Sequence, residues 1–439
     1  MKVEMKDSGI PWIGKIPKDW KIARIKDLTT EENTLFLDGD WIDSYNITDE
    51  GIRYLTTGNI GEGYFKEQGN GYISQNTFDK LKCLAVYPND LAISRLNIPL
   101  GRSCIIPNSF EKYIVAVDVT ILRCDSSYYK RYLMYCMNVP SYNEMAKLIA
   151  RGTTMLRLSR TLLGTLQLPI PPYQLQKQIA NFLDEKCADV DQLITLQQQM
   201  IDELKAYKQS VITEAVCKGL DKSVPMKDSG IEWIGEVPEG WIVAPLKNYV
   251  SCNDKSLSEN EDKNKIINYI EIGSVNNCGE IQNVQELIFS NAPSRARRKV
   301  NNNDVIISCV RTYLKSIAKI TNEQDNYICS TGFAVLRPNR KINPDYLYYC
   351  LFSDVFTSNV EANSTGISYP AINTPKLLGL KIIVPTRTEQ SIIVSFLNKK
   401  IKEIDTLISI KQQKIDELKE YKKSMIYEYI TGKKQVPNE

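Results

Sequence analysis

Apolar residues recur at seven-residue intervals through two long stretches of the chain, one before residue 220 and one near the C-terminal end. In each stretch two heptad positions, a and d, are mostly apolar, as in a coiled-coil helix. The residues of this predicted seam are Leu183, Val190, Ile194, Ile201 and Leu204 in the first stretch and Leu397, Ile404, Ile408, Ile415 and Leu418 in the second. The pattern predicts helices over 173–218 and 387–431, each about 67 Å long at about 1.5 Å per residue.

Polar residues interrupt the two seams at equivalent places, Gln197 and Lys208 in the first and Lys411 and Lys422 in the second. Such polar layers can fix the register of a helix pair. Because two copies of the pattern in one chain can satisfy each other, we expect an intramolecular pair. The alternative is that the helices dimerise two chains.

The chain contains an internal duplication. Residues 5–20, MKDSGIPWIGKIPKDW, recur as residues 226–241, MKDSGIEWIGEVPEGW. The helical segment IDELKAYK at 201–208 recurs as IDELKEYK at 415–422, whereas the residues between these repeats diverge. The chain is therefore two homologous halves. Because the second start motif follows the first helix directly, we expect the first start motif to lie beside the end of the second helix, in a closed, pseudo-two-fold arrangement.

The middle of each half alternates short β-like runs, such as 113–122, with helix-like segments near 128–137 and 345–352. The fold class predicted is α/β, with two mixed α/β domains separated by two long antiparallel coiled-coil helices. The expected divisions are a first domain at 1–172, a first spacer helix at 173–218, a second domain at 219–386, a second spacer helix at 387–431 and a tail at 432–439.

Composition excludes several classes of protein. The chain has no histidine, which removes the commonest general base and every histidine-ligated metal site. Eleven cysteines without a C-x-x-C spacing indicate reduced core thiols rather than a disulfide framework. The start of the chain lacks the apolar core of a signal peptide, and no apolar run is long enough to span a membrane. We therefore expect a cytoplasmic protein without a membrane partner and without a metal site.

Motifs that resemble catalytic loops fail at their key residues. Residues 9–16 resemble a phosphate-binding loop, but Ile16 replaces the Ser or Thr that binds magnesium, and Glu236 replaces the lysine in the second copy. The start motif is then expected either to pack on its own domain or to anchor a partner. The segment Ile170-Pro171-Pro172-Tyr173 resembles the loop of an amino-methyltransferase, yet Ile170 cannot accept a hydrogen bond from an amino group. The chain is therefore expected to carry no catalytic residue and no cofactor.

Basic residues gather locally, although the net charge is only +3. Such clusters bind phosphates, and arginine also reads guanine in the major groove; the alternative is an ordinary solvated basic face. The candidate DNA-binding residues are Arg95, Arg102, Arg151, Gly152, Thr153, Thr154, Arg157 and Arg160 in the first half and Arg295, Arg297, Arg298, Arg311, Lys315, Thr365, Gly366 and Tyr369 in the second.

Taken together, the chain resembles the specificity subunit of type I restriction-modification systems over essentially its whole length. The resemblance is carried by the duplicated G-I-x-W-I-G-x-x-P-x-x-W and by the run from Gly152 to Gln176 that leads into the first helix. The second half keeps this run from Ser364 to Gln390 but has Thr386 where the first half has Pro172.

The resemblance implies a non-catalytic subunit with two target-recognition domains, each of which reads one half of a split double-stranded DNA sequence. It also implies that the helices recruit two DNA-adenine methyltransferase subunits, which two ATP-dependent restriction subunits can join. S-adenosylmethionine, ATP and magnesium would then belong to these partners.

Because the loops differ between the halves, we expect a non-palindromic, bipartite target with half-sites about 10 base pairs apart. If the helices act as a ruler, four residues inserted near Gln197 lengthen the spacer by about 6 Å and widen the unread gap. The competing hypothesis is a two-domain coiled-coil interaction scaffold that reads no DNA. That scaffold would not explain why the framework is duplicated while the loops diverge.

Overall fold

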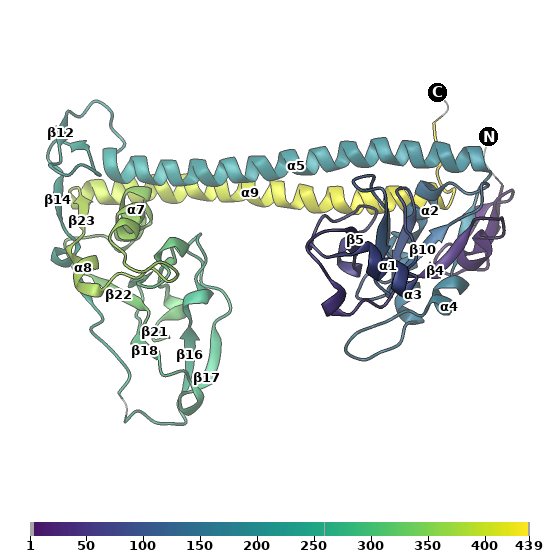
Figure 1. Ribbon diagram of the computed structural model, residues 1–439. Helices are drawn as coiled ribbons and strands as arrows, with labels where there is room; N and C mark the ends of the chain where they lie inside the picture. The colour runs from purple at the N-terminus through teal and green to yellow at the C-terminus, as the bar shows by residue number, and fades with distance from the viewer. Residues whose placement is uncertain (1–3, 259, 438–439) are drawn as a thin grey trace. The chain divides into compact units, whose positions relative to one another are not determined.

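The computed structural model describes residues 4–258 and 260–437 (Figure 1). It forms two compact units: unit 1 runs to Gln197 and resumes at Gln413, and unit 2 comprises Gln198–Gln412. Each unit therefore holds one mixed α/β body and part of each long helix, α5 (Tyr173–Lys218) and α9 (Arg387–Ile430). The expected fold class is confirmed.

Unit 1 is built on a four-stranded antiparallel sheet with strand order β4-β10-β7-β8. A three-stranded sheet, β6-β5-β9, contains the parallel pair β5 and β9, and two further pairs are β1-β2 and β11-β3. The strands are β1 (Met5–Asp7), β2 (Lys15–Pro17), β3 (Lys21–Arg24), β4 (Leu35–Asp38), β5 (Ile52–Leu55), β6 (Tyr72–Ile73), β7 (Leu91–Ser94), β8 (Ser103–Ile105), β9 (Tyr113–Val115), β10 (Val119–Arg123) and β11 (Gln167–Ile170). The helices are η1 (Ile25–Leu28), η2 (Ser44–Asn46), η3 (Thr57–Asn59), α1 (Gln75–Leu81), α2 (Lys130–Met137), α3 (Pro140–Leu148) and α4 (Arg160–Thr165).

Unit 2 repeats this topology. Its sheet β15-β22-β19-β20 has the same order, β16 and β21 form the parallel pair, and β14 pairs with β23. The strands are β12 (Met226–Asp228), β13 (Glu236–Pro238), β14 (Ile242–Pro245), β15 (Val250–Cys252), β16 (Ile266–Ile270), β17 (Gln285–Ile288), β18 (Ala296–Lys299), β19 (Val305–Ser308), β20 (Ile317–Lys319), β21 (Ile328–Ser330), β22 (Phe333–Pro338) and β23 (Lys381–Val384). The helices are η4 (Leu246–Asn248), η5 (Ile272–Ser274), η6 (Phe289–Asn291), η7 (Thr312–Leu314), η8 (Asn322–Gln324), α6 (Pro344–Phe352), α7 (Asp354–Ala362) and α8 (Thr374–Gly379).

Strands β7, β8 and β10 of the central sheet of unit 1 are buried on both faces, which explains their continuous apolar runs, whereas the edge strand β4 is partly exposed. Successive side chains of a strand point to opposite faces. On β7, Leu91 and Ile93 pack with α2, whereas Ala92 joins the core on the other face with Val119 and Ile121. The cysteines are all free, and most of them are buried, although Cys278 is exposed. Burial raises the pKa of the Cys104 thiol to about 12, so it stays protonated and unreactive.

The two long helices pack antiparallel, as expected, and equivalent ion pairs mark their register in the two units. Lys422 binds Asp191 at 2.7 Å in unit 1, and Lys208 binds Asp405 at 2.8 Å in unit 2. The two lysines are 214 positions apart in the sequence, and so are the two aspartates, so the ion pairs occupy equivalent positions of the two halves. The heptad lysines Lys208 and Lys422 are therefore each paired with an aspartate. The seam residues Leu183, Val190, Ile201, Leu397, Ile404 and Ile415 are buried, and Ile194, Leu204, Ile408 and Leu418 are partly buried.

The first start motif lies against the last turn of α9, as the duplication predicts. The Tyr427 hydroxyl donates to the carbonyl oxygens of Trp12 and Ile13, each at 3.2 Å. Trp12 is buried, with its ring edge-on to Tyr142 at 5.8 Å. The first start motif therefore packs on its own domain. Among the described residues, no helix is long and apolar enough to cross a membrane, and no cluster of side chains could hold a metal ion.

Gly432→Ala is expected to destabilise unit 1 by more than backbone strain alone. Gly432 follows the end of α9 and has φ +69°, and a Cβ there would lie 2.4 Å from Cδ of Pro17. A left-handed conformation costs a non-glycine residue about 1–2 kcal/mol, and the collision adds to this. Gly9→Ala is the matched control, because Gly9 has φ +72° with nothing within 4 Å of the added carbon. Equal losses in the denaturant midpoint for the two variants would contradict the expected contact.

Candidate nucleic-acid interface

The buried side chain of Arg102 joins two loops of unit 1. Its guanidinium donates to the carbonyl oxygens of Ile60 at 2.7 Å and Thr57 at 2.8 Å in the first loop. It also donates to the carbonyl oxygens of Asn97 at 2.9 Å and Pro99 at 3.0 Å in the second. Burial lowers the pKa of this guanidinium from its usual value, although an arginine stays charged at any physiological pH. The charge is therefore used to hold backbone carbonyls in place.

Arg95 connects a third loop to the same surface. Its guanidinium donates to the carbonyl oxygen of Leu158 at 2.8 Å and pairs with Asp38 at 3.1 Å. The neighbouring Leu96 forms a β-bridge with Arg157, which in turn bridges Arg151 and closes the third loop. We call residues 57–68, 96–101 and 151–157 the three-loop face of unit 1.

Two further side chains, which the sequence did not point to, bind backbone carbonyls of the first loop. The Asn59 amide donates to the carbonyl oxygens of Lys66 at 3.0 Å and Gln68 at 2.8 Å. The buried Arg53 guanidinium donates to the carbonyl oxygens of Gln68 and Gly71, both at 2.9 Å. The loop backbone is thus fixed while its outer side chains stay exposed. The one signal in the sequence is the run of glycines at positions 58, 61, 63, 69 and 71.

Unit 2 carries the same three-loop face with different side chains; it comprises residues 272–283, 310–315 and 365–371. Ser316 occupies the position equivalent to Arg102, and its hydroxyl donates to the carbonyl oxygen of Val275 at 2.9 Å. Val275 is the counterpart of Ile60, so one scaffold contact is kept by a different residue. Ala371 forms β-bridges with Val310 and Thr365, which close the third loop as Arg157 does in unit 1.

Most of the predicted DNA contacts lie on these faces, but two of them do not reach the surface. Arg95 and Arg102 are buried and engaged with backbone carbonyls, so the expectation that they contact DNA is not supported. The exposed candidates on the two faces are Arg151, Gly152, Thr153, Thr154, Arg157, Arg311, Thr365, Gly366 and Tyr369. Lys315 is half-buried in the second loop of unit 2 and pairs with Asp354 at 3.6 Å.

The remaining candidates lie beside the faces. Arg160 begins α4 and is half-buried. Arg297 and Arg298 belong to β18, an edge strand of its sheet, and the Arg297 guanidinium lies over the Phe289 ring at 5.0 Å. Arg295 is exposed just before this strand. These residues therefore lie outside the loops that make up the faces.

A second surface runs along one side of the long helices. Heptad positions g and c of both helices lie on the same flank of the antiparallel pair, opposite position e. Exposed apolar residues occupy this flank in each unit, at equivalent positions. They are Leu193, Leu196 and Tyr421 in unit 1 and Leu407, Ile410 and Tyr207 in unit 2. We call these two sets the helix stripes.

Each α/β body contacts its helices from the opposite flank and leaves the helix stripe open. In unit 1 the Tyr135 hydroxyl donates to the e-position carboxylate of Asp184 at 2.8 Å. In unit 2 the equivalent Tyr349 hydroxyl donates to the e-position amide oxygen of Asn398 at 2.6 Å. The same pair of positions therefore orients both bodies on the helices.

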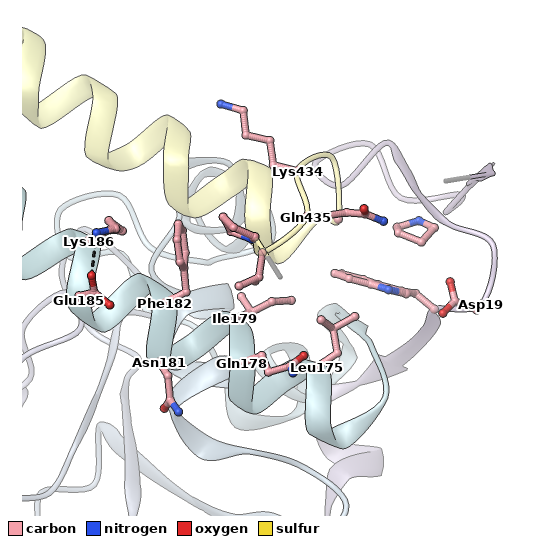
Figure 2. Close-up of a pocket in the computed structure, with 15 residues that line it drawn as sticks. Asp19, Leu175, Gln178, Ile179, Asn181, Phe182, Glu185, Lys186, Lys434 and Gln435 are labelled. Atoms are coloured by element: carbon pink, nitrogen blue, oxygen red, sulfur yellow. Dashed lines mark hydrogen bonds and ion pairs between the residues drawn. The ribbon is translucent and has the colours of Figure 1, made fainter. Parts of the chain in front are cut away.

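The stripe of unit 1 leads toward a cavity of about 760 Å³ at the start of α5. Figure 2 shows Leu175, Ile179 and Phe182 projecting from α5 into this space, with Lys434 and Gln435 of the C-terminal tail on its other side. Leu175, Ile179 and Phe182 occupy c and g positions, as do the stripe residues of α5. The cavity therefore forms an open, partly apolar end of the same surface.

Comparison with known proteins places the chain among DNA specificity proteins. The family model described as "Type I restriction modification DNA specificity domain" matches residues 17–206 and 238–435. The MjaVIII specificity subunit of Methanocaldococcus jannaschii is 24% identical over 97% of this chain and 95% of its own length. The putative MjaX specificity subunit of that organism is 26% identical over 97% and 96%.

Two solved structures share the fold at 15% identity. A chain from a study of complex assembly and conformational transition of the type I restriction-modification system has a TM-score of 0.69 and covers 95% of this chain and 99% of its own. The HsdS subunit of Thermoanaerobacter tengcongensis has a TM-score of 0.53 and covers 95% and 98%.

Proposed function

Because this chain belongs to the family of type I restriction-modification DNA specificity subunits, we propose that each three-loop face reads one half of a bipartite, asymmetric DNA sequence. A specificity subunit is non-catalytic and carries no cofactor of its own. The observation that carries the proposal is the shared scaffold of the two faces. Arg102 and Ser316 hold equivalent carbonyls, while the exposed side chains around them differ.

Differences between the faces support an asymmetric target. The third loop of unit 1 presents Thr153 and Met155 where that of unit 2 presents Ile367 and Tyr369. Arg151 and Arg157 flank the first set, and Arg311 lies over Tyr369 of the second. These arginines can bind phosphates, whose contacts position a protein while base contacts specify the sequence. Different base-facing side chains on one scaffold then select different half-sequences. We propose residues 1–172 and 219–386 as the two target-recognition domains.

The helix stripes support the recruitment of two partner subunits. Heptad-spaced apolar residues on an open flank are suited to a helix from another protein. One equivalent stripe in each unit implies two copies of that partner, which we propose are DNA-adenine methyltransferase subunits. Two ATP-dependent restriction subunits can join the assembly, and S-adenosylmethionine, ATP and magnesium belong to these partners. In this proposal the helices at 173–218 and 387–431 also set the length of the unread gap between the two half-sequences. Residues 432–439 form a tail, and the complex works in the cytoplasm. The alternative of a scaffold that reads no DNA does not agree with the family.

The test is to co-express the chain with its methyltransferase subunit and to map methylated adenines by single-molecule sequencing. We expect a split, asymmetric sequence that disappears when the chain is omitted. Thr153→Ala should relax only one half-sequence, and Tyr369→Ala only the other, because each of these base-facing residues lies on one face. A palindromic sequence, or changes in both halves from either substitution, would contradict the proposal.

A further inference from the structure

The tip of each three-loop face exposes large apolar side chains. In unit 1, Ile98 and Met155 are 60% and 58% exposed. In unit 2, Ile367 and Tyr369 are 103% and 66% exposed. Met155 and Tyr369 hold equivalent positions of the third loop, and Ile98 comes from the second loop beside it. Two faces with different sequences thus share an apolar tip.

The backbone of the third loop keeps these side chains outward. Gly152 has φ +114°, and a Cβ there would lie 2.3 Å from the carbonyl oxygen of Met155. Gly366 has φ +107°, and its Cβ would lie 3.0 Å from the carbonyl oxygen of Tyr369. Only glycine fits these turns, and the β-bridges at the loop base close each turn. The backbone therefore fixes the position of the apolar tip in both faces.

Cationic side chains lie beside both apolar tips. In unit 1, Arg151 and Arg157 stand at the two ends of the third loop. In unit 2, the Arg311 guanidinium lies over the Tyr369 ring at 5.1 Å. When these cations contact phosphates, the apolar side chains next to them face the bases rather than the backbone. Proteins that place Ile, Met or similar groups there in the minor groove partly unstack a base step and bend the duplex.

We propose that the two tips are wedges, formed by Ile98 and Met155 in unit 1 and by Ile367 and Tyr369 in unit 2. Each wedge inserts from the minor groove into one base step and partly unstacks it. This inference rests on the proposed function, because it assumes that the three-loop faces contact DNA. The wedge predicts a preference for a pyrimidine–purine step at one position in each half-site, because these steps unstack most easily. This preference requires no hydrogen bond to the bases at that position.

The experiment uses the chain in complex with its methyltransferase subunits and a duplex that contains the mapped target. The fluorescent base 2-aminopurine, which brightens on unstacking, replaces successive purines of each half-site in turn. We expect brightening at one step in each half. Met155→Ser should remove it in one half only, and the double variant Ile367→Ser with Tyr369→Ser in the other half only.

Ile266→Ser is the matched control, because Ile266 is 62% exposed in unit 2 but starts β16, away from the face. It should leave both signals unchanged. A wild-type complex that methylates the split sequence without any brightening would overturn the wedge and leave the reading function intact. Loss of affinity on replacing thymine by uracil, without brightening, would instead show contact with thymine methyl groups in the major groove. Absence of a split methylated sequence would refute the proposed function itself.

Discussion

Leu193→Asp together with Leu407→Asp is expected to abolish recruitment of methyltransferase subunits while the chain stays folded. Both leucines are exposed at equivalent g positions of the helix stripes, so neither substitution removes a core contact. Burying a leucine against a partner contributes about 2 kcal/mol, and burying an aspartate in its place costs more. Each site should therefore weaken by at least about 100-fold.

The stoichiometry of the complex, measured by analytical ultracentrifugation, provides the test. Wild type should bind two methyltransferase subunits, either single variant one, and the double variant none. Gln198→Asp is the matched control, because Gln198 is also exposed on α5 but lies at position e on the opposite flank. Loss of both partners from one single variant, or loss caused by Gln198→Asp, would show that the stripes are not two independent docking sites.

Arg102→Ala should destabilise unit 1 and erase the half-sequence that this unit reads. The substitution removes a buried guanidinium that donates to carbonyls in two loops. Each buried acceptor left unsatisfied costs about 1–3 kcal/mol, and water entering the cavity offsets part of this. We expect a net loss of about 3 kcal/mol or more. The loops would then move independently, so one half of the methylated sequence should become degenerate while the other is kept.

Ser316→Ala tests whether this effect follows the number of scaffold contacts. Ser316 makes the equivalent contact in unit 2 through one hydrogen bond, to the carbonyl oxygen of Val275. Its loss should cost about 1 kcal/mol and disturb only the other half-sequence. Denaturant midpoints and methylation maps for both variants provide the comparison. An unchanged methylation map for Arg102→Ala would mean that Arg102 does not position the reading loops.

Local periodicity explains what could be predicted before the fold was known. The heptads over α5 and α9 repeat every seven residues, and each repeat indicates the same buried seam. Single polar residues in the seam, such as Gln197 or Lys208, therefore do not hide the pattern. The duplication places the end of α9 against the first start motif, a contact that Tyr427 makes. The strand order of both central sheets, in contrast, is decided by pairing between segments far apart, such as β4 with β10.

The sequence by itself determined the two halves, the long helices, the absence of histidine chemistry and the regions where cations gather. Only the tertiary structure decided which cations face solvent. Arg102 and Arg157 look alike in sequence, yet Arg102 meets carbonyls 42 and 45 positions away, whereas Arg157 stays at the surface beside Asp118. The free energy of a guanidinium depends on what surrounds it in space, and loops distant in sequence supply those surroundings. The three-loop faces and their apolar tips could therefore be found only in the folded chain.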